Sequence, residues 1–354
     1  NVFVGKRIWC SAKENLCRMC LDGKISKEEL EEKILAMGEK KFRAGQIYDW
    51  LHINKVEEFS KMTNLSAQLR EKLDDIFWIN SLKIQKRLVS DIDNTVKYLY
   101  GLSDGEKVET VLMEYKHGNS ICISTQVGCK MGCKFCASTK AGFVRNLEPS
   151  EMLLQIYESE RDSGRKINHV VLMGIGEPLD NFDNVVKFLR LLSAKDDMSL
   201  RHVSVSTCGL VNRIYELADL KLGITLSVSL HAPTNELRSS IMPINDRFRI
   251  EELMEACKYY FNTTGRRISY EFALIDGVND NRQSADALLK LLKGQNCHVN
   301  LIPVNEIKEG IFKRSASVEK YKQMLIDGGL NATVRRTLGA DISAACGQLR
   351  RDNK

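Results

Sequence analysis

The stretch SICISTQVGCKMGCKFCASTKAGFVRNL, residues 120–147, decides how the second half of the chain folds. It opens with a β-branched run that predicts a strand, and it continues into a loop with three cysteines at C-x3-C-x2-C spacing. Gly128 and Gly132 allow the backbone of this loop to turn tightly enough to aim three thiols at one point. The three cysteines are Cys129, Cys133 and Cys136.

Strands and amphipathic helices alternate after this point. The predicted strands span residues 120–127, 169–174, 202–207, 224–230, 268–274 and 298–304. The predicted helices span residues 150–160, 184–192, 210–220, 250–261, 284–294 and 318–326. Six βα units in order predict an α/β fold with a parallel sheet, which right-handed crossovers would curl into a partial (β/α)6 barrel. The cysteine loop would then open at the carboxyl ends of the strands, where barrel active sites lie.

The pattern of apolar and turn residues divides the first third of the chain into three segments. Residues 1–24 show no clear period and form an unassigned N-terminal extension. Residues 25–78 predict a small all-helical accessory domain, with Ser26 and Glu29 as a capping box at its first helix. Residues 79–117 are short β-branched runs with turn signals between them, which predict a β-hairpin linker. Residues 118–354 form the barrel with a C-terminal segment.

Composition limits the classes of protein. Of the 354 residues, 43% are hydrophobic and 28% are charged, which excludes a disordered, collagen-like or coiled-coil chain. No membrane span and no secretory signal is visible, so we expect a cytoplasmic protein. Eleven cysteines, an odd number, point to metal, cluster or redox chemistry and away from a secreted disulfide framework.

The three loop cysteines alone leave two interpretations open. A structural zinc ion wants four ligands in a closed tetrahedron, and no fourth Cys or His follows at short distance. A [4Fe–4S] cluster held by three thiolates keeps one iron open, which is a catalytic arrangement. An electron-transfer or structural metal-binding protein is therefore the non-enzyme alternative. Cys10, Cys17 and Cys20 could hold zinc or a second cluster, or be free thiols.

The motifs resemble a known family. C-x3-C-x2-C with Phe135 resembles the signature of the radical S-adenosylmethionine (SAM) superfamily. Together with VVLMGIGEPLDN, SLHAPTNELRSSIMPIN, LIPVN and ACGQL, it resembles the RlmN/Cfr family of RNA adenosine methyltransferases. The run KKFRAGQIYDWLH is similar to RlmN-type members, and the resemblance covers residue 26 to the end. It implies a [4Fe–4S] cluster on Cys129, Cys133 and Cys136, with SAM on the open iron as the source of a 5′-deoxyadenosyl radical.

The same resemblance implies a SAM-binding set at the ends of the strands. Glu177 in the GEP segment would face the ammonium of SAM, a charge complement that makes physical sense. Taken alone, this segment would be only a loop, and a lone histidine such as His231 would be a structural residue. The implied contacts are Gly176, Glu177, Ser206, Ser229, Leu230, His231 and Asn305.

Three further residues receive catalytic roles from the resemblance alone. Cys346 would be methylated by a first SAM and become the methyl carrier, so that two SAM molecules are used per turnover. Cys122 would resolve the covalent RNA adduct and leave a Cys122–Cys346 disulfide for reduction in the cytosol. Glu109 would accept the ring proton. Without the resemblance, both cysteines would be small buried apolar residues, and Glu109 a solvated strand residue.

The resemblance also implies partners. RlmN-type enzymes methylate C2 of an adenosine in large-subunit rRNA, and many also methylate tRNA; Cfr-type enzymes methylate C8, and this alternative stays open. The target base would have to leave its stack to reach a buried cluster. Lys40, Lys41, Arg43 and the basic segment 306–354 could contact RNA, although charge alone favours plain surface. We also expect a monomer with a flavodoxin- or ferredoxin-type electron donor.

Overall fold

A ten-stranded sheet runs through the larger part of the molecule, in the order β14-β13-β12-β11-β10-β9-β6-β5-β4-β3. The computed structural model describes residues 19–20, 25–194, 198–307 and 310–350. From β6 to β14 every neighbouring pair of strands is parallel. The parallel strands are β6 (Gly118–Cys122), β9 (Ile167–Leu172), β10 (Val203–Thr207), β11 (Thr225–Ser229), β12 (Ile268–Leu274), β13 (Cys297–Pro303) and β14 (Ala332–Val334).

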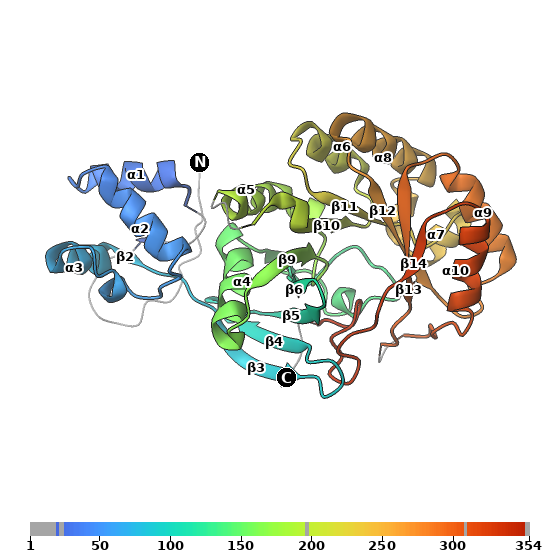
Figure 1. Cartoon of the computed structure of the whole chain (residues 1–354), viewed down its shortest axis with the longest axis horizontal. Coiled ribbons are helices and arrows are strands. Elements are labelled where there is room, and N and C mark those ends of the chain that lie inside the picture. Colours follow the sequence, from blue (N-terminus) through green and yellow to red (C-terminus); the bar gives the residue numbers. More distant parts are fainter. Residues whose placement is uncertain (1–18, 21–24, 195–197, 308–309, 351–354) are drawn as a thin grey trace.

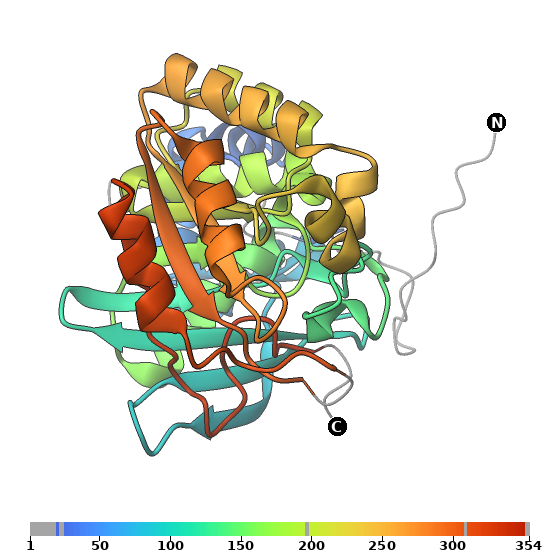
Figure 2. The ribbon, with the colours of Figure 1, turned by 90° about the vertical axis from the view of Figure 1, so that its right-hand side faces the viewer.

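Helices follow the parallel strands and cover the outer face of the curved sheet (Figures 1 and 2). They are α4 (Pro149–Ser163), α5 (Phe182–Ser193), α6 (Val211–Asp219), α7 (Asn235–Ile241), α8 (Ile250–Thr264), α9 (Arg282–Leu292) and α10 (Val318–Asp327). This arrangement confirms the predicted partial barrel. Helix α7 and strand β14 were not predicted. Short 3₁₀ turns lie at η2 (Ala137–Thr139), η3 (Pro178–Asn181), η4 (Leu200–His202) and η5 (Pro243–Asp246).

The two faces of the parallel strands differ in chemistry because side chains alternate along a strand. Val205, Val228 and Phe272 point outward into the hydrophobic core beneath the helices. Their neighbours Ser206 and Ser229 point inward and line a cavity. The sheet is therefore apolar toward its helices and polar toward the barrel interior.

The predicted hairpin strands continue the barrel sheet as its antiparallel edge. They are β3 (Lys83–Val89), β4 (Val96–Gly101) and β5 (Lys107–Tyr115), and β5 pairs with β6 in antiparallel register. Val111 of β5 lies opposite Cys122 of β6. This pairing brings the side chains of β5 beside the first barrel strand.

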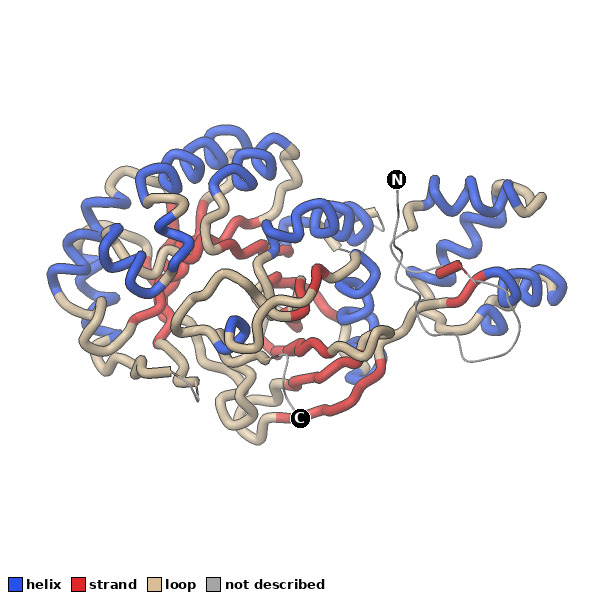
Figure 3. Tube along the Cα trace, turned by 180° about the vertical axis from the view of Figure 1, so that it is seen from behind, coloured by secondary structure: helices blue, strands red, loops and turns tan. Residues whose placement is uncertain are grey.

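The N-terminal helical domain has a core of its own and lies beyond α4 and α5 (Figure 3). It contains α1 (Lys27–Ala36), α2 (Phe42–His52), η1 (Phe59–Lys61) and α3 (Ala67–Ile76). Ser26 and Glu29 form the predicted capping box. One short parallel strand pair, β1 (Met19–Cys20) with β2 (Phe77–Trp78), adds to the expected helices. Cys10 and Cys17 lie outside the described residues.

Contacts tie this domain to the barrel. Lys55 forms an ion pair with Glu160 of α4, and the ammonium of Lys187 lies 2.8 Å from the carboxylate of Glu29. Within the described part of the chain, no helix has the length and apolar character that crossing a membrane requires.

Candidate active site

The cysteine loop leaves the barrel after β6 and is closed at its base by two short strands. β7 (Gln126–Val127) pairs with β8 (Arg145–Asn146). Gly128 has a φ of +76°, and an added Cβ there would lie 1.8 Å from the carbonyl oxygen of Gly142. Only glycine allows the two arms of the loop to approach this closely.

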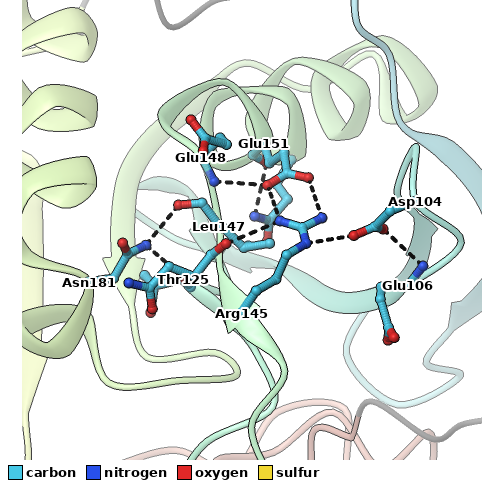
Figure 4. A network of polar contacts seen from close by, with 10 residues as sticks. Asp104, Glu106, Thr125, Arg145, Leu147, Glu148, Glu151 and Asn181 are labelled. Atoms are coloured by element: carbon cyan, nitrogen blue, oxygen red, sulfur yellow. Dashed lines mark hydrogen bonds and ion pairs between the residues drawn. The ribbon is translucent and has the colours of Figure 1, made fainter. Parts of the chain in front are cut away.

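Arg145 anchors the returning arm of the loop (Figure 4). Its guanidinium donates two hydrogen bonds of 2.8 Å to the carboxylate of Glu151 at the start of α4. A third donor, Nε, lies 2.6 Å from Asp104 in the β4–β5 turn. The bidentate geometry fixes the loop relative to both α4 and the antiparallel edge.

The loop after β9, which carries Gly176, Glu177 and Pro178 and is called the GEP loop below, packs closely against the cysteine loop. Gly176 has a φ of +111°, and an added Cβ would lie 2.7 Å from Cβ of Gln126. Asn181 donates hydrogen bonds of 2.8 Å to the carbonyl oxygens of Thr125 and Leu147 (Figure 4). The first two βα loops of the barrel therefore form one unit.

Glu177 is buried in this unit with its carboxylate toward the cavity. It accepts hydrogen bonds from the backbone N–H of Leu179 at 3.0 Å and of Cys208 at 2.7 Å. Burial raises the pKa of the Glu177 carboxyl, while the backbone donors, with Cys208 first, act in the opposite direction. Cys208 follows β10 and lines the same cavity, a residue that sequence reasoning missed.

One cavity at the carboxyl ends of the strands collects most of the predicted residues. It is lined by the three loop cysteines and by the predicted SAM contacts Gly176, Glu177, Ser206, Ser229, His231 and Asn305, together with Cys346. Leu230 is buried in the core cluster and does not line this cavity. Segments that are far apart in sequence therefore meet at the position where barrel chemistry occurs.

His231 adopts a left-handed backbone conformation with a φ of +55°. Its Nδ1 accepts a 2.8 Å hydrogen bond from the backbone N–H of Ala273, so the ring proton is on Nε2. Burial lowers the pKa of His231 to about 3. Its ring stacks edge-to-face on Phe135 with centroids 4.9 Å apart. His231 is therefore a neutral donor with a fixed orientation.

The segment around Cys346 crosses over the cysteine loop. The backbone N–H of Ala137 donates to the carbonyl oxygen of Gly347 at 2.7 Å, and the Ser138 hydroxyl donates to that of Leu349 at 2.8 Å. Asn305 Nδ2 donates to the carbonyl oxygen of Cys346 at 3.0 Å. These bonds hold Cys346 at the edge of the cavity by its backbone and leave its thiol free of them.

A second cavity adjoins the first, and Cys346 lines both. Its other lining residues include Cys122 and, from β5, Val111, Met113 and Tyr115. Burial raises the pKa of the Cys122 thiol to about 12; nearby Cys346 adds to this rise and Arg335 opposes it. The two cysteines with predicted catalytic roles thus share a cavity.

Arg335 also lines both cavities, and sequence reasoning missed it because VRRTLG carries no recognisable motif. Its guanidinium nitrogens lie 3.4 Å from the sulfur of Met173 and 3.6 Å from the carboxylate of Glu271. The negative charge of a Cys346 thiolate is the largest cause that raises the pKa of Arg335. Arg335 therefore supplies positive charge beside Cys346.

Glu109 lies outside the lining of both cavities, although it is on the same face of β5 as Val111 and Met113. It is buried, with an ion pair to Lys97 at 3.0 Å. Its Oε2 accepts a 2.7 Å hydrogen bond from the backbone N–H of Arg350. The contacts of Glu109 hold the C-terminal segment, and its role as proton acceptor stays a prediction.

The donor set fits a cluster with an open iron. Three thiols from one loop line a cavity that also offers oxygen and nitrogen donors for a small molecule. Among the described residues, no group of three or more His, Cys, Asp or Glu side chains is arranged about a single metal ion. The cluster geometry differs, because each thiolate binds a different iron.

Comparisons with known proteins agree with this site. Residues 23–79 match the family described as the ribosomal RNA large subunit methyltransferase N-terminal domain, and residues 123–289 match the radical SAM superfamily. A relative from Clostridium novyi (strain NT), described as "Probable dual-specificity RNA methyltransferase RlmN", is 51% identical over 92% of this chain and 96% of its own length. A relative of the same description from Lachnoclostridium phytofermentans is 51% identical over 92% and 93%.

A solved structure extends the match to three dimensions. The crystal structure of a radical SAM methyltransferase from Sphaerobacter thermophilus superposes with a TM-score of 0.90 at 40% identity, covering 94% of this chain and 100% of that one. The resemblance predicted from the motifs is confirmed over nearly the whole length. The chain belongs to the RlmN family of radical SAM RNA methyltransferases.

Proposed function

We propose that this protein methylates C2 of adenosine in large-subunit rRNA and in tRNA, with Cys346 as the methyl carrier. The observation that carries the proposal is the position of Cys346, which lines both the cavity of the three loop cysteines and the cavity of Cys122. The relatives described as dual-specificity RNA methyltransferases support more than one RNA substrate, and the match of residues 23–79 supports large-subunit rRNA as one of them. An electron-transfer or structural metal protein would have no use for this pair of thiols.

The residues of the first cavity would hold the cofactors. Cys129, Cys133 and Cys136 would bind the [4Fe–4S] cluster, and Glu177 would pair with the ammonium of SAM. The cluster supplies one-electron cleavage of bound SAM to a carbon-centred radical. His231, neutral with its proton on Nε2, would donate a hydrogen bond without adding charge. The polar inner face, with Ser206 and Ser229, would orient the rest of the molecule.

A thiol that carries the methyl group avoids a direct reaction between two electrophilic carbons. Carbon C2 of adenine is electrophilic, and so is the methyl group of SAM, so direct transfer between them is mismatched. A Cys346 thiolate would instead attack the methyl group of a first SAM, forming a carbon–sulfur bond while the sulfur of SAM takes the bonding electrons. A second SAM per turnover would then serve as the radical source. The guanidinium of Arg335 lines the same two cavities as Cys346 and would place positive charge beside the attacking sulfur.

The second cavity would release the product. Addition of the carrier carbon to the base leaves one unpaired electron, which would return to the oxidised cluster, while Glu109 is our candidate acceptor for the ring proton. The Cys122 thiolate would then attack the sulfur of Cys346. A sulfur–sulfur bond forms, the carbon–sulfur bond breaks, and its electron pair stays on the product carbon, which takes up a proton and becomes the methyl group. Because burial keeps Cys122 protonated at neutral pH, its thiol must give up a proton as it attacks. A cellular dithiol then reduces the disulfide, which requires a reducing compartment such as the cytoplasm.

Each part of the fold is assigned a separate role in the proposal. We propose that residues 25–78 act as an RNA-binding accessory domain, that residues 79–117 link it to the barrel, and that residues 118–354 carry the chemistry. A monomer with a flavodoxin- or ferredoxin-type donor completes the proposal. The basic residues Lys40, Lys41 and Arg43 lie at the start of α2, where they could contact an RNA backbone.

The test uses anaerobically purified, cluster-reconstituted protein with SAM, a reductant and either large-subunit rRNA or tRNA. The RNA is digested and its nucleosides are identified by mass spectrometry. We expect 2-methyladenosine from wild type and none from Cys346→Ala, while Cys257→Ala, a buried cysteine of α8, retains activity. 8-Methyladenosine would replace the proposal by a Cfr-type activity, and unimpaired Cys346→Ala would exclude the carrier role.

A further inference from the structure

Arg238 of α7 is a fully buried arginine beside the first cavity. Its Nη2 donates to the carbonyl oxygens of Cys208 at 2.6 Å and Ser229 at 3.2 Å, and its Nε donates to that of Leu230 at 3.1 Å. Nη1 donates to the side-chain oxygen of Asn245 at 3.2 Å. The guanidinium therefore joins the carboxyl ends of β10 and β11, and all four acceptors are neutral.

No ion pair within the described residues includes Arg238. A guanidinium does not lose its proton in a protein. Burying such a charge without an anionic partner is strongly unfavourable. Two arginines that lie near the cavity or its loops contrast with it: Arg145 pairs with Glu151 and Asp104, and Arg335 has Glu271 at 3.6 Å. The positive charge of Arg238 therefore needs an anion that its protein hydrogen bonds do not provide.

The surroundings identify that anion. Helix α7 packs on the cysteine loop, because Lys134 donates its backbone N–H to Ile241 at 3.0 Å and Met242 lines the cavity. Burial lowers the pKa of the Arg238 guanidinium, and the nearby thiols of Cys208, Cys133 and Cys257 act in the opposite direction. Of these three, only Cys133 belongs to the predicted cluster ligands. A metal-bound thiol is deprotonated outright, so cluster binding would place a permanent negative charge at Cys133.

We propose that Arg238 is the buried counter-charge of the iron–sulfur cluster and that it favours the reduced form of that cluster. The inference rests on the proposed cluster site and adds a positioning residue to it. Reduction adds one electron, delivered by a low-potential one-electron reductant, and makes the cluster and its thiolates more negative. A nearby buried cation stabilises this form more than the oxidised one. The same guanidinium holds Cys208 and Ser229, two residues that line the cofactor cavity.

The test is an anaerobic redox titration of the reconstituted full chain, followed by the electron paramagnetic resonance signal of the reduced cluster. In Arg238→Gln we expect the ratio of reduced to oxidised cluster at a fixed potential to fall about tenfold, or about 59 mV for one electron. Arg238→Lys keeps the charge and should stay within about threefold of wild type. The matched control is Arg266→Gln, since Arg266 donates to Ile224 and Thr225 at the opposite end of β11.

Iron and sulfide analysis of each protein distinguishes a failure of the proposed function from a failure of the inference about Arg238. A wild type that assembles no cluster would overturn the proposed function, and the inference with it. An Arg238→Gln variant with a full cluster and an unchanged potential would overturn the inference alone.

If Arg238→Gln does not fold, the inference can be tested on the wild type by amide hydrogen exchange with and without the cluster. Removal of the cluster by a chelator should speed amide exchange in α7 and at Cys208 at least about tenfold, because Arg238 loses its counter-charge. Exchange around Arg266 should not change. Unchanged exchange in α7 would overturn the inference.

Discussion

The carboxylate of Glu109 and the ammonium of Lys97 form a buried ion pair, with 3.0 Å between Oε1 and Nζ. Both partners also hold the C-terminal segment by its backbone. Lys97 donates to the carbonyl oxygen of Ser343 at 3.0 Å, and Glu109 accepts from the N–H of Arg350 at 2.7 Å. This antiparallel edge of the sheet therefore supports the segment that carries Cys346.

Lys97→Met should destabilise the fold by about 3–5 kcal/mol, because it removes one partner of a buried ion pair. Denaturant unfolding measures the free energy. The matched control is Arg282→Met, which breaks an exposed pair with Asp286 and should cost less than about 0.5 kcal/mol. Adding Glu109→Gln to Lys97→Met should recover part of the loss. A loss for Lys97→Met no greater than the control's would contradict the role of the pair.

Cys122→Ala should trap the RNA on Cys346 as a covalent adduct, because the thiol that resolves it is absent. Denaturing gel electrophoresis of the reaction, with labelled RNA and SAM, would show a band that shifts with the protein. Cys257→Ala should give no such band and Cys122→Ala/Cys346→Ala should abolish it. Free methylated RNA released by Cys122→Ala at the wild-type rate would exclude the resolving role.

Gly176→Ala should weaken SAM binding at least about tenfold. The added Cβ would lie 2.7 Å from Cβ and 2.9 Å from the backbone nitrogen of Gln126, at a φ of +111° that L-residues avoid. The GEP loop would have to shift, and Glu177 with it. Gly38→Ala is the control: its φ is +78° with nothing within 4 Å, so it should cost about 1 kcal/mol of stability and leave SAM binding unchanged. Equal SAM affinity in both variants would refute the prediction.

His231 should make stability depend on pH. Its pKa is lowered to about 3 in the folded chain, from 6.5 for an ordinary histidine, so unfolding takes up a proton between these values. The stabilisation from the neutral ring is complete above pH 6.5 and is lost as the pH falls, by about 1.4 kcal/mol per pH unit.

His231→Asn is the comparison, because asparagine tolerates a positive φ and can accept the N–H of Ala273. Urea unfolding of both proteins from pH 7.5 to 5.5 would measure the difference in unfolding free energy. That difference should be constant down to pH 6.5 and then shrink by about 1.4 kcal/mol at pH 5.5. A difference that does not change with pH would show that His231 is not held neutral.

Local patterns predicted most of the fold. Ser26 caps α1 in the predicted capping box, and the alternation of strand and helix after residue 120 gave the parallel sheet. Helix α7 was not predicted, because its seven residues are too few to show an apolar face with helical periodicity. The continuity of β5 with β6 depends on strand register, which the residues of either strand do not determine alone.

The site was predictable where a motif carried it and not elsewhere. The loop cysteines, Glu177 and Cys346 lie in distinctive motifs, and the structure brings them to one cavity. Arg335 and Arg238 gave no signal of their own, because arginines are mostly exposed and a lone one carries no periodicity. Arg238 did lie inside the quoted segment SLHAPTNELRSSIMPIN, but its burial follows only from how α7 packs on the cysteine loop.

The way Cys346 is held also fixes an order of events during synthesis. Its supports, among them Asn305, Ala137 and Ser138, leave the ribosome before it does. A growing chain can therefore present the cysteine loop on a nearly complete parallel sheet while the cavity still lacks the side that Cys346 and Gly347 provide. Formation of the cysteine loop and closure of the site are then separate steps of synthesis, and the linear sequence puts closure last.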